Sequence, residues 1–143
     1  MTSGFYDVYG LAPHRTAETV AQFLSKLVPQ RAESADEYEV PQFADQPEII
    51  FDSAESLIAH CVEHLNVPHI IYWRSLVDGD PANAIAAFTV DGALILGLSV
   101  SSDPEYWLSE ILVAINGDDG VILFEKAPPS SLLEFVALSR RSS

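Results

Sequence analysis

Two histidines one helical turn apart are the residues of this sequence best suited to metal chemistry. His60 and His64 flank Glu63 in the spacing H-x-x-E-H, in which the histidines bind zinc and the glutamate is the general base. His69 is a candidate third nitrogen ligand. On a helical wheel, however, both histidines fall at the edge of the apolar stripe. One hypothesis is therefore a zinc-dependent hydrolase or metal-binding protein, and the alternative is a pair of boundary histidines with no metal.

Other catalytic patterns are weak. The single cysteine, Cys61, lies on the apolar stripe of the same helix, where a thiol packs as a small apolar group. The sequence contains no G-x-S-x-G, G-x-G-x-x-G or G-x-x-x-x-G-K-[ST] motif. We therefore expect a protein that is not an enzyme and holds no cofactor. One cysteine and the absence of a basic-then-apolar leader favour a reducing, cytoplasmic location.

Acidic residues dominate the charge. The chain has 21 Asp and Glu against 7 Lys and Arg, which gives a net charge of −14. Between Arg31 and Arg74 there is no Lys or Arg, and the next one after Arg74 is Lys126. Because nucleic acids and anionic membrane surfaces bind through Lys and Arg, neither is expected as a partner. The charge serves either solubility or the attraction of a basic protein.

The segment between Arg31 and Arg74 combines carboxylates with aromatic side chains, as partner-binding surfaces do. Arg74 stands alone between the two acidic segments, so we expect it either in an ion pair or as an anion-binding residue. The candidate partner-binding residues are Glu33, Asp36, Glu37, Tyr38, Glu39, Phe43, Asp45 and Glu48.

Hydrophobic periodicity, capping residues and turn signals divide the chain into alternating elements. They predict a single α+β domain over residues 1–143 in the order β-α-β-α-β-β-β-α-β-α, with a mainly antiparallel central sheet and helices packed on it. Residues 30–47 are expected to be mostly loop, with a short edge strand allowed at 38–40. The expected strands are 5–9, 48–51, 69–76, 82–90, 93–100 and 121–125, and the expected helices are 17–28, 54–65, 104–115 and 131–140.

Asp91-Gly92 links two apolar runs and predicts a β-hairpin with a two-residue loop. That loop would place Val90 opposite Ala93 and Phe88 opposite Ile95. One face of the hairpin then carries small apolar residues. It is covered either by helices or by a second copy of the chain, so an uncharacterised homodimeric domain is a further alternative.

Several short patterns resemble those of small acidic immunity proteins of bacterial toxin systems. They are Tyr72-Trp73-Arg74, the hairpin of residues 88–99, and Phe124-Glu125 before Pro128-Pro129, so the resemblance spans residues 72–129. It implies a non-enzymatic cytoplasmic protein that binds a toxin and blocks its active site or a surface that it needs. An acidic surface suits the basic clefts of many nucleases, so the charge favours the same hypothesis.

Overall fold

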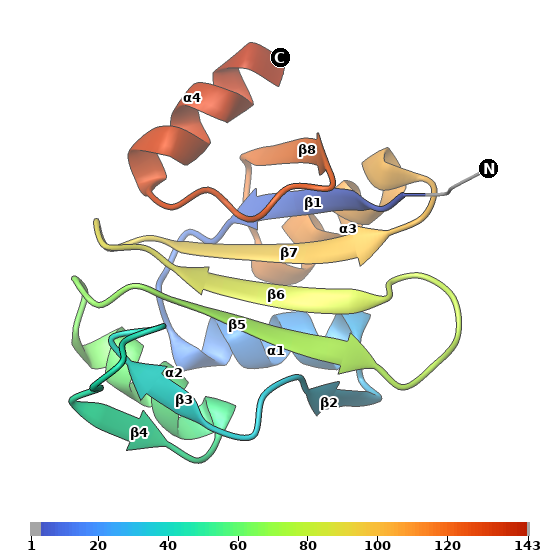
Figure 1. The fold of residues 1–143 in the computed structure, drawn as a ribbon. Coiled ribbons are helices and arrows are strands. Elements are labelled where there is room, and N and C mark those ends of the chain that lie inside the picture. Colours follow the sequence, from blue (N-terminus) through green and yellow to red (C-terminus); the bar gives the residue numbers. More distant parts are fainter. Residues whose placement is uncertain (1–3, 143) are drawn as a thin grey trace.

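Two antiparallel sheets of unequal size organise the chain. The computed structural model describes residues 4–142 and contains a six-stranded sheet in the order β2-β5-β6-β7-β1-β8 and a two-stranded sheet, β3-β4 (Figure 1). The expected α+β class with a mainly antiparallel sheet is confirmed. The strands are β1 (Tyr6–Leu11), β2 (Arg31–Glu33), β3 (Tyr38–Val40), β4 (Ile49–Phe51), β5 (His69–Ser75), β6 (Asn83–Phe88), β7 (Leu94–Val100) and β8 (Gly120–Phe124), and the helices are α1 (Ala17–Leu27), α2 (Ala54–Glu63), α3 (Pro104–Ile115) and α4 (Leu132–Ser142).

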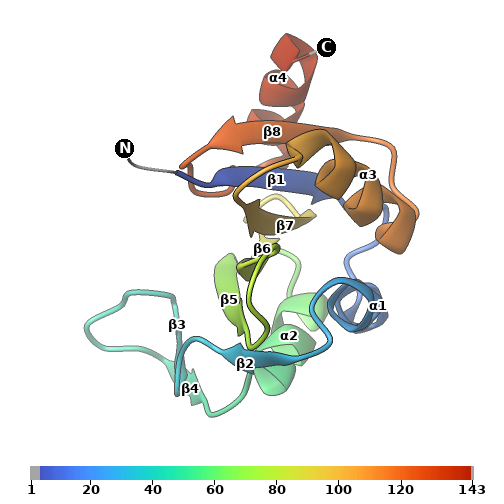
Figure 2. The ribbon, with the colours of Figure 1, turned by 90° about the vertical axis from the view of Figure 1, so that its right-hand side faces the viewer.

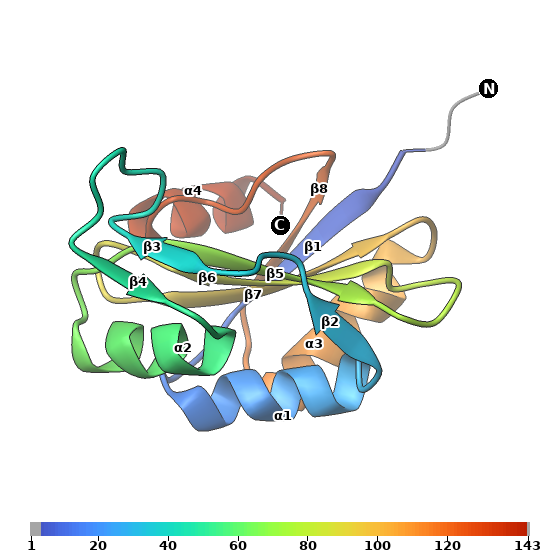
Figure 3. The ribbon, with the colours of Figure 1, turned by 60° about the horizontal axis from the view of Figure 1, so that its bottom comes forward.

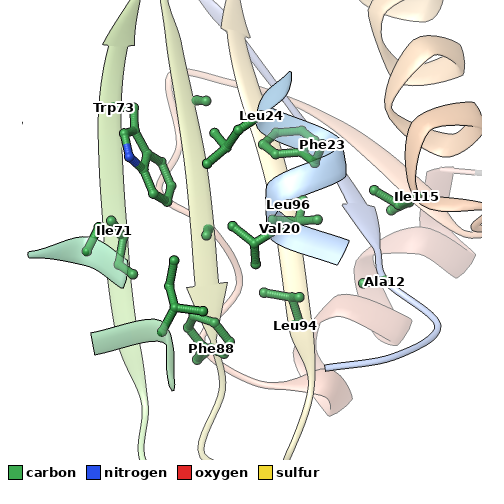
Figure 4. Packing of buried hydrophobic residues seen from close by; sticks show 14 of the residues in the cluster. Ala12, Val20, Phe23, Leu24, Ile71, Trp73, Phe88, Leu94, Leu96 and Ile115 are labelled. Carbon is green, nitrogen blue, oxygen red and sulfur yellow. The ribbon is translucent and has the colours of Figure 1, made fainter. Parts of the chain in front are cut away.

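Helices cover both faces of the large sheet. Helices α1, α2 and α3 lie on one side and α4 lies on the other (Figure 3). The main core forms under the three helices, where Val20 and Leu24 of α1 lie over the central strands (Figure 4). A smaller cluster forms on the opposite face around the fully buried Phe135 of α4. The central strands are therefore apolar on both sides, which explains their nearly unbroken apolar sequence.

The segment that leads to α4 is fixed to the sheet by buried polar groups. The Tyr9 hydroxyl donates to the carbonyl oxygen of Lys126 at 2.7 Å, and the backbone N–H of Lys126 donates to Asp7 Oδ2 at 2.8 Å. Gly97 lies directly opposite Tyr9, and a Cβ atom at Gly97 would lie 2.4 Å from the tyrosine ring. Glycine is therefore required there, because it leaves the space in which Tyr9 packs.

The predicted register of the central hairpin is wrong by one residue. Phe88 pairs with Leu94, not with Ile95, because the loop has three residues, Val90 to Gly92. Thr89 closes this loop: its N–H donates to the Ala93 carbonyl oxygen, and its hydroxyl accepts from the Ala93 N–H. A shift of one residue exchanges the faces of one strand relative to the other. Both faces of the hairpin are buried within the chain, so it offers no open face for a homodimer.

The segment between α1 and α2 contains three short strands, whereas the sequence predicted one strand and a long loop. Strand β2 pairs with the edge of β5, and β3 pairs with β4 in the small sheet. Strands of three residues are too short to show the alternation by which strands are recognised. The short strand that the sequence allowed at 38–40 is present as β3.

Capping side chains start most of the helices as expected. Thr16, Ser53 and Ser131 each accept a hydrogen bond from the backbone N–H three residues later. Asp103 was expected to cap α3 in the same way, and that prediction is wrong. Asp103 adopts a left-handed backbone conformation (φ 54°), and its side chain makes no capping hydrogen bond.

Helix α4 has a second cap from a distant part of the chain. The Asp91 carboxylate accepts the N–H of Leu132 at 2.8 Å and of Leu133 at 3.3 Å, and it accepts the Thr89 hydroxyl at 2.6 Å. These bonds, the Leu132 N–H above all, lower the pKa of Asp91 below its usual value. The turn of the central hairpin thus fixes the start of α4.

Replacing Asp91 with Ala is expected to lower the free energy of unfolding at neutral pH by about 1 kcal/mol, the usual value of a helix cap. Because the pKa of Asp91 is depressed in the folded state, its contribution is present above the unfolded value of about 3.9 and is lost as the pH falls through the folded value. Urea unfolding of both proteins between pH 7 and pH 2.5 measures the difference. Equal stabilities at neutral pH would contradict this role of Asp91.

Candidate functional site

An acidic arm is the most prominent surface feature of the molecule. We define the arm as residues 34–52, which include β3, β4 and the turn between them, and which extend away from the large sheet (Figure 2). Phe43 lies in the turn and is 82% exposed. The exposed carboxylate residues of the arm are Asp36, Glu37, Asp45, Glu48 and Asp52.

Two of the expected partner-binding residues instead hold the base of the arm. Tyr38 is only 3% exposed, so the prediction that it is a surface anchor is wrong. Its hydroxyl donates to Glu33 Oε1 at 2.9 Å, and the same oxygen accepts the N–H of Ala54 at the start of α2 at 2.9 Å. Burial, followed by the nearby Glu33, raises the pKa of Tyr38, which keeps the hydroxyl protonated as a donor. Glu33 therefore joins the arm to α2.

The arm is also attached to the edge of β5. The Gln42 side chain donates to the carbonyl oxygen of Ile70 at 3.1 Å and accepts the N–H of Ile70 at 2.9 Å, as a neighbouring strand would. The buried His69 ring places Nε2 2.9 Å from the carbonyl oxygen of Glu39. Burial lowers the pKa of His69, so the ring is neutral and donates this hydrogen bond. These contacts fix the position of the arm and close part of the β5 edge.

The turn of the arm holds Phe43 in an unfavourable state. Its backbone is left-handed (φ 66°), which costs free energy for a residue with a bulky side chain. The Phe43 N–H lies 3.4 Å from Glu39 Oε1, and the N–H of Ala44 donates to the carbonyl oxygen of Pro41. The half-buried Glu39 thus helps to shape the turn. The ring is 82% exposed, so it is free to contact a partner.

The structure does not gather the three candidate zinc ligands. The His60 and His64 rings stack with their centroids 4.3 Å apart, and His64 Nδ1 lies 2.9 Å from the carbonyl oxygen of His60. His69 points instead to the base of the arm. Among residues 4–142 there is no group of three or more His, Cys, Asp or Glu placed to hold a metal ion. The geometry therefore gives no support to the zinc hypothesis.

Arg74 lies on an exposed position of β5, opposite Asn83 of β6 and Ala32 of β2. Within the part of the chain that the structure describes, its guanidinium has no ion-pair or hydrogen-bond partner. Tyr72 lies on the same face of the strand two residues earlier and is also exposed. The expected ion pair is therefore not formed within residues 4–142, and the anion-binding alternative stays a prediction.

Arg15, which the sequence did not single out, makes more side-chain hydrogen bonds than any other residue within residues 4–142. Its guanidinium donates to five carbonyl oxygens at 2.8–3.1 Å and lies 5.0 Å from the centre of the Phe88 ring. One of the carbonyls lies in the last turn of α2, two follow the end of that helix, and two flank the loop of the central hairpin. Only a basic residue next to the capping Thr16 marks the position in the sequence. The acceptors are those of Cys61, His64, Val67, Thr89 and Ala93.

Cys61 is fully buried, as expected of a packed thiol. Burial raises the pKa of this thiol to about 11, so it is protonated at neutral pH and is a poor nucleophile. A groove of about 720 Å³ between α1 and α2 has an apolar floor that includes Trp73 and carries Glu18 and Glu55 at its rim, but no His, Cys, Ser or Lys lines it. Neither feature offers the pairing of a nucleophile with a base that covalent catalysis uses.

The fold and the surface together define an antiparallel α+β domain that carries a fixed acidic arm with an exposed aromatic tip. Comparison of the chain with protein-family models, with curated proteins and with solved structures found no match. No helix within residues 4–142 is long and apolar enough to cross a membrane.

Proposed function

We propose that this chain is a non-catalytic protein-binding domain that presents its acidic arm to a basic protein, in the manner of an immunity or inhibitor protein that blocks a toxin. The observation that carries the proposal is the placement of Phe43 at the tip of the arm, 82% exposed and among unpaired carboxylates. Binding energy concentrates in desolvated aromatic side chains, and a charged rim directs the approach of the partner. Phe43 supplies the aromatic side chain, and the arm carboxylates supply the charged rim.

The charge of the whole chain supports the same proposal. With a net charge of −14, the domain attracts a basic surface from a distance, and the arm places several carboxylates where that surface would arrive. The free, protonated Cys61 suits a reducing compartment, so we propose the cytoplasm as the location. In this proposal the protein acts by covering the basic cleft of its partner, and it carries out no reaction of its own.

A capture experiment tests the proposed function. Tagged wild type and a Phe43→Ser variant are used to capture proteins from a lysate of the source cells at low and high salt. We expect the wild type to recover a basic protein at low salt only, since salt screens exposed charges, and we expect the variant to lose it. Val113→Ser is the matched control, because Val113 is 67% exposed on α3, which packs against β1, β7 and β8 and not against the arm. Equal recovery by wild type and Phe43→Ser would overturn the proposal.

A further inference from the structure

A groove of about 450 Å³ lies between the arm and the segment that leads to α4. Three segments that are distant in the sequence form its walls: the turn of the arm, the connection from α2 to β5, and the segment just before α4. Its apolar walls include Pro41, Val67, Pro68, Ile70 and Pro129. Phe43 stands at the same groove, so a partner that contacts Phe43 also reaches these walls.

Glu48 is the only charged residue that lines the groove, and its carboxylate has no hydrogen bond or ion pair within residues 4–142. Among the other polar side chains that line the groove, Asn66 forms no hydrogen bond within residues 4–142, and Gln42, His69 and Ser130 are engaged. The Gln42 amide bonds to the backbone of Ile70, and His69 bonds to the carbonyl oxygen of Glu39. Burial keeps His69 neutral, so no positive charge competes for Glu48. The groove therefore combines apolar walls with one free negative charge.

This combination fits a side chain that is aliphatic along its length and cationic at its end. The methylene groups of Lys or Arg pack on apolar surface while the charged end stays at a polar rim. An uncharged aliphatic side chain would leave Glu48 without a partner, and an acidic side chain would be repelled by it. We propose that the groove receives a Lys or Arg side chain of the basic partner, with its cationic end at Glu48; this inference rests on the proposed function.

Nuclear magnetic resonance tests the groove directly with small probes. Uniformly ¹⁵N-labelled protein is titrated with N-acetyl-lysine methylamide and, separately, with N-acetyl-norleucine methylamide, which has the aliphatic stem without the charge. We expect the lysine probe to shift the amide signals of Gln42, Glu48 and Ile70 with a dissociation constant in the millimolar range, and the norleucine probe to bind more weakly. Glu48→Gln should weaken the lysine probe about fivefold, the upper value for an exposed ion pair.

Asp45→Asn is the matched control, because it removes the same charge from the same arm at a residue that does not line the groove. We expect this variant to bind the lysine probe as the wild type does. Equal binding of the two probes, equal weakening by both substitutions, or absence of shifts at the groove would each overturn the inference. If Phe43→Ser still abolishes capture of the partner in that case, the groove assignment fails and the proposed function stands. Capture that survives Phe43→Ser would instead refute the proposed function.

Discussion

Replacement of Arg15 with Ala is expected to lower the free energy of unfolding by about 3 kcal/mol, because partly buried acceptors lose their charged donor. The guanidinium joins the connection before α1, the end of α2 and the loop of the central hairpin through five carbonyl oxygens. The last carbonyls of a helix have no partners within the helix and carry a partial negative charge, so a cation there is favourable. Burial lowers the pKa of Arg15, but the group remains protonated.

Urea unfolding at neutral pH measures the effect, with two further variants as comparisons. Arg15→Lys should recover only part of the loss, because an ammonium group has three donors and cannot span acceptors that lie around a planar fork. Arg31→Ala should cost less than about 1 kcal/mol, since Arg31 donates to a single carbonyl oxygen, that of Val28. An Arg15→Ala protein as stable as the wild type would show that water replaces these bonds without cost.

Reversal of three arm charges is expected to slow association with the basic partner about 10- to 100-fold at low salt, since electrostatic steering raises association rates by factors of this size. The substitutions are Asp36→Lys, Glu37→Lys and Asp45→Lys. None of these side chains forms a hydrogen bond within residues 4–142, so the fold should be unaffected. Stopped-flow mixing with the captured partner gives the association rate, and the difference should disappear at high salt.

The control for this experiment changes the net charge by the same amount at another site. The substitutions are made on α3 and in the loop before β8, away from the arm. They are Glu105→Lys, Asp118→Lys and Asp119→Lys. We expect this variant to lose only the part of the attraction that comes from total charge. If both triple variants slow association equally, steering depends on the overall charge and the arm has no special part in it.

Local chemistry made much of the fold predictable. Thr16 and Ser53 act within one helical turn, so the starts of α1 and α2 could be read from the sequence. The features that could not be predicted depend on distant residues. Asp91 caps a helix 41 residues later, and the acceptors of Arg15 lie 46 to 78 residues away. No periodic pattern records such pairs, because they exist only once the sheet has formed.

The candidate site could also be predicted only in part. The concentration of carboxylates before α2 was visible in the sequence, and the structure places Asp36, Glu37, Asp45 and Glu48 on an exposed arm. Composition could not separate the two aromatic residues. Tyr38 faces the core because it lies on the buried face of β3, whereas Phe43 lies in the turn after that strand and faces solvent. The prediction of the hairpin register was wrong for a related reason, because the hydrogen bonds of the Thr89 side chain set the length of the loop.

The most direct measurement of partner binding is the hydrogen-exchange footprint of the complex. Amide exchange is recorded for the free protein and for the protein bound to its captured basic partner. We expect new protection to concentrate in residues 36–50 and at Ile70 in the adjoining groove, while the helical face formed by α1 and α3 exchanges as before. Protection of another surface with unchanged exchange in the arm would contradict the account, because the partner would then bind elsewhere.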